Sequence, residues 1–197
     1  MNRRNLIKYG FAFGSVALPK YLWGQGRGGR GGAQLDGPLI RLVLEKAGSR
    51  PYWTPVGLFV EKGQKVHWRA AGVTATVTAF HPSNDNHELR IPEGARPFDS
   101  GPIQGDFEWT FDVEGTYDFF CRGLESIGTV GRIVVGSPGG PAEKPPGYGG
   151  SEGRAPIFPA EAKILGLVPS KEIMAKKIIR FDTDVIYQPY PSLSPLE

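Results

Sequence analysis

Cysteine is almost absent from this sequence, and histidine is nearly as rare. The single cysteine is Cys121, so no disulfide can form within the chain. The three histidines are His67, His81 and His87, which leaves few imidazoles for metal binding or acid–base catalysis. The sequence has no Ser-His-Asp spacing and no phosphate-binding loop, and its carboxylates are scattered over expected turns. We therefore expect that the protein is not an enzyme.

Long blocks of charge are missing as well. The formal net charge is +3, and no run of Lys and Arg exceeds what a solvated surface carries. Residues 24–32 contain Arg-Gly-Gly repeats of the kind found in RNA-binding tails, although a run of this composition is expected to be a flexible tether. We expect no nucleic-acid partner. Glycine (28 residues) and proline (18) are abundant, which favours a loop-rich all-β protein with irregular flanks.

The first residues have the features of an export signal. Arg3 and Arg4 lie in a stretch that resembles the twin-arginine motif, and a mostly apolar run from Tyr9 to Leu18 follows. That run is shorter than the roughly 20 residues that a membrane-spanning helix needs. We expect export by the twin-arginine route to the periplasm or cell surface. If the signal is not cleaved, it would remain as an N-terminal membrane anchor; a short amphipathic helix is the alternative.

Composition divides the chain into four parts. These are a signal with a Gly/Arg-rich tether (1–33), a domain of short strands (34–137), a Pro/Gly linker (138–153) and a C-terminal appendage (154–197). In the appendage, Pro159 to Gly166 and Ser170 to Ile179 predict two short helices, followed by an extended end. Because the appendage is too short to form its own core, we expect it to pack on the domain or on another chain.

Short alternating runs separated by turns fill residues 34–137. Seven or eight such runs predict one antiparallel β-sandwich of Greek-key type. Core candidates on two of the strands are Trp109, Phe111, Tyr117 and Phe119. Cys121 falls on the same face as Tyr117 and Phe119, whereas Asp118 and Phe120 point to the other face.

The stretch from Glu114 to Val135 resembles the copper loop of the cupredoxins, in particular the halocyanin, plastocyanin and pseudoazurin group. The residues that fit the family pattern are Gly115, Tyr117, Cys121, Glu125, Gly128 and Gly131. Pieces at 90–95 and 97–101 also resemble these proteins, so the resemblance covers about residues 50–137. It implies an all-β, cupredoxin-like Greek-key β-sandwich, to which the short helical and extended C-terminal appendage is added.

The resemblance also implies where copper ligands would lie. A type 1 copper site uses two imidazoles, one thiolate and a weak axial ligand such as methionine. The cysteine of the family is Cys121, but its two histidines fall on Ala75 and Leu124 and its methionine falls on Thr129. Methyl and isobutyl groups bind no copper, and one thiolate would not hold the ion. We expect no cofactor; a copper-binding electron-transfer protein that uses Cys121 with atypical ligands is the alternative.

The histidines offer little compensation for the missing ligands. His67 is expected at the surface or at a sheet edge. His81 would lie roughly 20 Å from Ala75 along an extended strand. His87 lies in a polar loop that could fold back or bind a metal by itself. Without imidazole partners, Cys121 is expected to pack as a small hydrophobic side chain.

A function that survives the loss of copper is protein binding. In cupredoxins the apolar surface around the copper site docks redox partners, so the resemblance implies a partner-binding patch here. The patch would comprise Phe120, Leu124, Ile127 and Val130. We expect Phe120, Ile127 and Val130 to face solvent and Leu124 to turn inward over the space that Ala75 leaves. The partner would be a protein, in a redox or membrane-associated complex.

Overall fold

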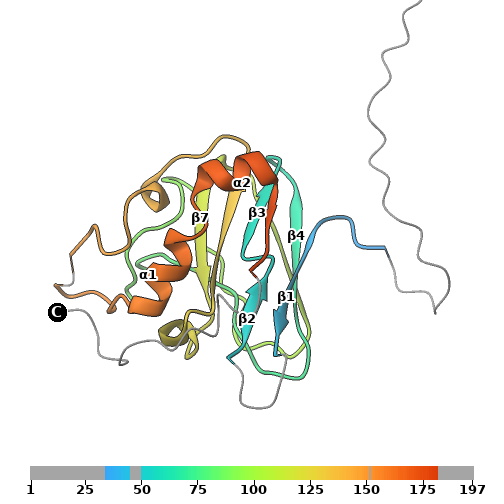
Figure 1. The fold of residues 1–197 in the computed structure, drawn as a ribbon, viewed down its shortest axis with the longest axis horizontal. Coiled ribbons are helices and arrows are strands. Elements are labelled where there is room, and N and C mark those ends of the chain that lie inside the picture. The colour runs from blue at the N-terminus through green and yellow to red at the C-terminus, as the bar shows by residue number, and fades with distance from the viewer. Residues whose placement is uncertain (1–33, 45–49, 151, 182–197) are drawn as a thin grey trace, which may run out of the picture. The chain divides into compact units, whose positions relative to one another are not determined.

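Two β-sheets face each other in the computed structural model, which describes residues 34–44, 50–150 and 152–181 (Figure 1). The first sheet has the order β2-β1-β4-β6 and the second β5-β7-β8-β3-β9. The strands are β1 (Leu39–Val43), β2 (Tyr52–Thr54), β3 (Gly57–Val60), β4 (Lys65–Ala70), β5 (Thr78–Ala79), β6 (Asp106–Thr110), β7 (Gly115–Phe120), β8 (Val130–Val135) and β9 (Ile178–Ile179). The sandwich prediction is therefore confirmed, whereas the prediction of wholly antiparallel sheets is wrong. Strand β1 pairs with β4, and β3 with β8, in parallel, because the connections between them cross from one sheet to the other and back.

The core between the sheets is built from alternating residues, as period-2 patterning requires. Trp68 of β4 lies at its centre, with ring centroids 5.9 Å from Phe98 and 5.7 Å from Phe119. Phe111 and Tyr117 belong to the same core, and Cys121 lies at one end of it. Asp118 and Phe120 point to the opposite face of β7, as the alternation predicted. Sequence alternation thus fixes which residues fill the sandwich.

A second apolar core lies on the outer face of the five-stranded sheet. Figure 1 shows helices α1 (Pro159–Gly166) and α2 (Ser170–Lys176) of the appendage against that sheet. The residues buried between helices and sheet are Val56, Phe80, Phe120, Val130, Val134, Ile164, Leu165, Val168 and Ile173. All six residues of β7 and of β8 are buried as a result. The appendage therefore packs on the domain, one of the two outcomes expected for it.

Helix α2 ends earlier than the sequence pattern predicted. Lys177 has a φ of 65°, which breaks the helix after Lys176. Ile178 and Ile179 then pair with Leu58 and Gly57 as strand β9, at the edge of the five-stranded sheet. Backbone pairing with an open sheet edge replaces the last helical turn, because it gives these amide groups partners.

Residues 138–150 form a strap over the same outer face, so the prediction of a linker is wrong for them. The 3₁₀ helix η2 (Pro141–Glu143) lies within the strap, and Pro141 and Ala142 are buried. The carbonyls of Ala142 and Lys144 each accept a hydrogen bond from Arg90 at 3.1 Å. The high Pro and Gly content of the strap therefore reflects tight turns in a segment that is bound to the domain, not a flexible spacer.

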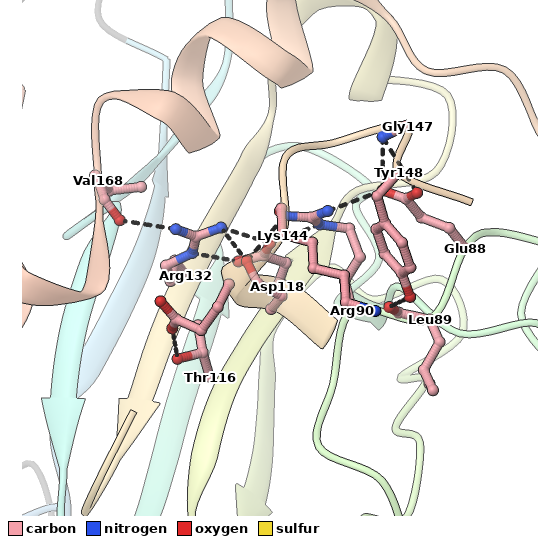
Figure 2. A network of polar contacts seen from close by, with 12 residues as sticks. Glu88, Leu89, Arg90, Thr116, Asp118, Arg132, Lys144, Gly147, Tyr148 and Val168 are labelled. Carbon is pink, nitrogen blue, oxygen red and sulfur yellow. Dashed lines mark hydrogen bonds and ion pairs between the residues drawn. The ribbon is translucent and has the colours of Figure 1, made fainter. Parts of the chain in front are cut away.

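A buried ionic network fixes the strap and the appendage to the sheet (Figure 2). Asp118 of β7 is its centre, and its carboxylate accepts a hydrogen bond from Arg90 Nε at 2.8 Å. Arg132 of β8 donates two more, from Nε at 2.7 Å and from Nη2 at 2.9 Å. Arg90 also donates to Glu88 at 2.9 Å. Two carboxylates and two guanidinium groups thus compensate each other in a fully or almost fully buried position.

The same guanidinium groups hold backbone carbonyls of the added segments. Arg132 Nη1 donates to Val168 O, between α1 and α2, at 3.3 Å, and Nη2 donates to Ala142 O of the strap at 3.0 Å. Glu88 accepts from the backbone N–H of Gly147, also in the strap, at 3.0 Å. Charged side chains of the sandwich therefore provide hydrogen-bond partners for the buried carbonyls and amides of the strap and the appendage.

Two sequence predictions fall outside this description. The export signal and its tether were predicted in residues 1–33, and the extended end of the appendage from residue 182 onward. Neither range is among the described residues. Within the described part of the chain, the helices are all too short to span a bilayer.

Candidate functional site

Cys121 follows β7 at one end of the sandwich. Its side chain is fully buried, and Sγ accepts a hydrogen bond from the backbone N–H of Thr76 at 3.3 Å. Burial raises the pKa of the thiol, so that the neutral form is favoured. Among the apolar residues of the sandwich core, the thiol packs as a small hydrophobic group.

The structure brings the other family ligand positions to the same end. The Leu124 N–H donates to Cys121 O at 3.0 Å, and the Thr129 N–H donates to Leu124 O at 3.1 Å. The Cys121 N–H in turn donates to Thr129 O at 3.0 Å. Ala75 precedes Thr76, whose amide reaches the sulfur. The loop between β7 and β8 thus brings together Cys121, Leu124 and Thr129, three of the positions where the family resemblance implied copper ligands.

The side chains at these positions do not fit a type 1 copper ion. Ala75 presents a buried methyl group, and Leu124 is half-buried against the core of the sandwich. The Thr129 hydroxyl donates a hydrogen bond to Pro51 O at 2.7 Å, so it is already engaged. Over residues 34–44, 50–150 and 152–181, no group of three or more His, Cys, Asp or Glu side chains is arranged to hold a metal ion.

His67 does not replace a missing imidazole, and its predicted surface or edge position is wrong. Strand β4 lies between β1 and β6, and His67 is buried there. Its Nε2 lies 2.7 Å from Asp36 Oδ1, and its Nδ1 lies 3.6 Å from Glu108 Oε2. Both ring nitrogens therefore face carboxylates, one from the segment before β1 and one from β6. His81 is engaged locally, with Nδ1 2.8 Å from Ser83 Oγ.

His87 folds back into the protein, one of the two outcomes expected for its loop. The ring lies between Phe80 and Phe120, with centroid distances of 5.2 Å and 4.4 Å. Its Nε2 lies 3.3 Å from Glu125 Oε2, without hydrogen-bond geometry. The polar sequence around His87 gave no signal for this burial, because one enclosing ring, Phe120, comes from the distant strand β7 and the other, Phe80, directly follows β5.

The partner-binding patch does not exist as it was predicted. Phe120 and Val130 are fully buried, because their side chains point to the outer face of the sheet, where α1 packs. Ile127 and Leu124 remain half-buried at the Cys121 end. Half-buried Val73 and Ile103 also pack against the sandwich core, and Ile103 bridges to Ala75 through two backbone hydrogen bonds.

A polar cluster beside Cys121 escaped the sequence analysis. Arg122 Nη1 donates to both carboxylate oxygens of Asp99, at 2.7 Å and 2.8 Å, and Arg122 Nε donates to Asp85. The two aspartates come from the long excursion between β5 and β6. Alternation within one strand cannot reveal such a contact, since the three residues are far apart in sequence.

Comparisons with known proteins give a match in structure but not in sequence. No protein-family model matches the chain, and no curated protein matches it significantly. A pseudoazurin from Methylobacterium extorquens is 17% identical with a TM-score of 0.54, and the match covers 70% of this chain and 99% of that one. A pseudoazurin from Sinorhizobium is 20% identical with a TM-score of 0.47, over 67% and 95% of the chains. A purple cupredoxin from Nitrosopumilus maritimus is 20% identical with a TM-score of 0.39, over 50% and 99%. At these identities the likeness concerns the fold alone.

Proposed function

We propose a function for this chain on the premise that it has the cupredoxin fold, as its resemblance to that family predicted. The chain is an exported, non-catalytic module that holds no type 1 copper and binds a protein partner. The observation that carries this proposal is the set of side chains around Cys121. Ala75, Leu124 and Thr129 occupy the positions of the other ligands, and none of the three offers copper a suitable donor.

The surface at this end supports the choice of protein binding. Half-buried apolar side chains of Val73, Ile103 and Leu124 pack against the core cluster that contains Cys121, and half-buried Ile127 follows Leu124 in the loop between β7 and β8. Partly exposed apolar side chains at one end of a domain are typical of a site where another protein docks. The partner class that follows from the resemblance is a redox or membrane-associated complex. Phe120 and Val130 have no part in this surface.

Copper loading of the purified protein tests the proposal directly. We expect well under one copper per chain and no intense thiolate-to-copper absorption. The triple variant Ala75→His, Leu124→His, Thr129→Met should gain that absorption, since the frame around Cys121 is kept. Adding Cys121→Ser to the triple variant is the matched control and should abolish the gain.

The alternative function is electron transfer by copper bound through Cys121 and atypical ligands. A stoichiometric blue copper centre in the unmutated protein would establish this alternative and reject the copper-free module. Partner binding is tested separately with Ile127→Lys, which places a charge at the Cys121 end. That variant should weaken the interaction, whereas Ile178→Lys, on the half-exposed edge strand β9, should leave it unchanged.

The proposed export is tested by replacing the two signal arginines. Arg3→Lys with Arg4→Lys should retain the protein in the cytoplasm, because the twin-arginine pair is what directs this route. Unchanged export of that double variant would reject the route while leaving the binding function open.

A further inference from the structure

Three polar atoms beneath helix α1 are buried without a hydrogen-bond partner. They are His87 Nδ1, Glu125 Oε2 and Glu161 Oε1. Glu161 is wholly inaccessible to solvent and His87 is 1% exposed. Buried polar atoms without a hydrogen bond are rare in folded proteins, since each loses its contacts with water. Glu125 Oε2 retains only its 3.3 Å approach to His87 Nε2. Their occurrence at one interface calls for a role beyond packing.

Glu161 projects from α1 toward the sandwich rather than toward solvent. One carboxyl oxygen accepts the backbone N–H of Phe158 at 3.5 Å, at the start of the helix, and the other has no partner. Helix α1 packs there against the 3₁₀ helix η1 (Glu125–Ile127), which carries Glu125. A second carboxylate therefore lies close to Glu161 within an apolar interface.

The surrounding charges do not neutralise Glu161. The charges of Glu125, from η1, and of Glu88, from the segment between β5 and β6, both oppose the ionisation of Glu161. Among the neighbouring charged groups, Arg90 favours it. Arg90, however, already donates to Asp118 and Glu88. His87 is paired with Glu125 at 3.3 Å. A negative charge on Glu161 would therefore be buried without a cation of its own.

Burial raises the pKa of Glu161 to about 8, and the charge on Glu125 adds to this effect. At neutral pH the carboxyl group is therefore protonated, and a neutral carboxyl group costs less to bury than a carboxylate. Once α1 leaves the sheet, Glu161 enters water and its pKa returns to the ordinary value near 4.5.

We propose that Glu161 is a proton-operated latch, which holds α1 on the outer face of the five-stranded sheet while it is protonated and releases the helix when it ionises. Release uncovers the apolar side chains of Phe80, Phe120 and Val130, which α1 and α2 cover in the closed form. The latch controls access to a second apolar face, and it does not depend on the function of the Cys121 end.

Linkage fixes the direction and the range of the effect. Since the docked helix binds a proton that the released helix loses, the equilibrium constant for release rises up to tenfold per pH unit between about 4.5 and about 8. Above about pH 8 both forms are ionised, and the constant levels off. Between pH 6 and pH 8 we therefore expect an increase of about 50-fold, since the docked form is already half ionised at pH 8.

Hydrogen exchange of the full chain measures this constant. Amides of α1 are followed from pH 5 to pH 10, corrected for intrinsic exchange rates, with β7 amides as the internal reference. The wild type should lose protection in α1 up to about pH 8 and then level off. Glu161→Gln, which cannot ionise, should show no such pH dependence. The matched control Glu172→Gln, whose side chain on α2 is exposed and pairs with Lys176, should behave as the wild type does.

A second variant keeps the test decisive if Glu161→Gln fails to fold. Glu125→Gln removes the nearest negative charge, so the pH at which protection levels off should move below that of the wild type. Protection of α1 that stays constant across the range in the wild type would overturn the latch. So would a pH dependence that persists in Glu161→Gln, or one that is unmoved in Glu125→Gln.

Discussion

Replacement of Asp118 by alanine is expected to be among the most damaging single changes in this protein. The carboxylate is fully buried and accepts three hydrogen bonds, one from Arg90 and two from Arg132. Glu88 then remains as the only carboxylate of the network, and one of the two guanidinium charges loses its counterpart. The network changes from neutral to a net charge of +1 without access to water.

The expected loss of stability comes from the buried positive charge that is left without a counterpart, rather than from the attraction that is lost. Removing one partner of a buried ion pair costs about 3–5 kcal/mol, because an uncompensated charge remains inside the protein. A domain has only about 5–15 kcal/mol of stability in total. For a chain of this length, each kcal/mol of lost stability lowers Tm by about 2–4 °C, so the expected fall in Tm is about 6–20 °C. The carbonyls of Ala142 and Val168 still hold Arg132, so the fold need not collapse.

Urea denaturation of the wild type and the Asp118→Ala variant measures the difference. The matched control is Asp106→Ala, which breaks a pair with Arg69 of similar geometry, at 2.6 Å, on the exposed side of the first sheet. That exposed pair should contribute less than about 1 kcal/mol. If Asp118→Ala cost no more than Asp106→Ala, the argument that burial makes this network indispensable would be refuted.

Three further outcomes are expected. Ile173→Ala should lower the free energy of unfolding by about 2–5 kcal/mol in urea denaturation, since Ile173 is fully buried between α2 and the sheet. Gly128→Ala should destabilise the protein more than Gly63→Ala: both glycines have left-handed φ angles near 80°, but only at Gly128 would the new Cβ come within 3.1 Å of α1. The pKa of Tyr117 is raised to about 12, mainly by burial, so the free energy of unfolding should fall as the pH rises from about 10 to about 12. Tyr117→Phe should remove that fall, and denaturation curves at several pH values measure it.

The sandwich could be predicted from sequence because its signals are local. Alternation placed Phe119 and Cys121 on the inner face of β7 and Phe120 on the outer face, and the structure agrees. The first helix of the appendage was predicted with its observed ends, since Pro159 starts it and Gly166 ends it. Patterns that arise within a few residues of chain thus predicted the elements and their faces.

What could not be predicted depends on contacts between distant segments. Phe120 and Val130 were expected to face solvent, and alternation could not reveal that residues some forty positions later would cover them. The Pro- and Gly-rich strap was taken for a linker, because nothing within it shows that Arg90 binds its carbonyls. The charge of Asp118 gave the only hint, since a lone carboxylate between aromatic residues on a strand needs a buried partner.

The loop that would carry the metal is held in place by the chain itself. Hydrogen bonds among the backbone groups of Cys121, Leu124 and Thr129 close the loop, and the Thr76 amide fixes the sulfur. Around this closed loop, Ala75 presents a methyl group, Leu124 an isobutyl group, and the Thr129 hydroxyl is engaged by Pro51 O. A rigid apolar surface loses little conformational entropy on association. We therefore propose that the same features that offer copper no suitable donors suit this end to binding a protein.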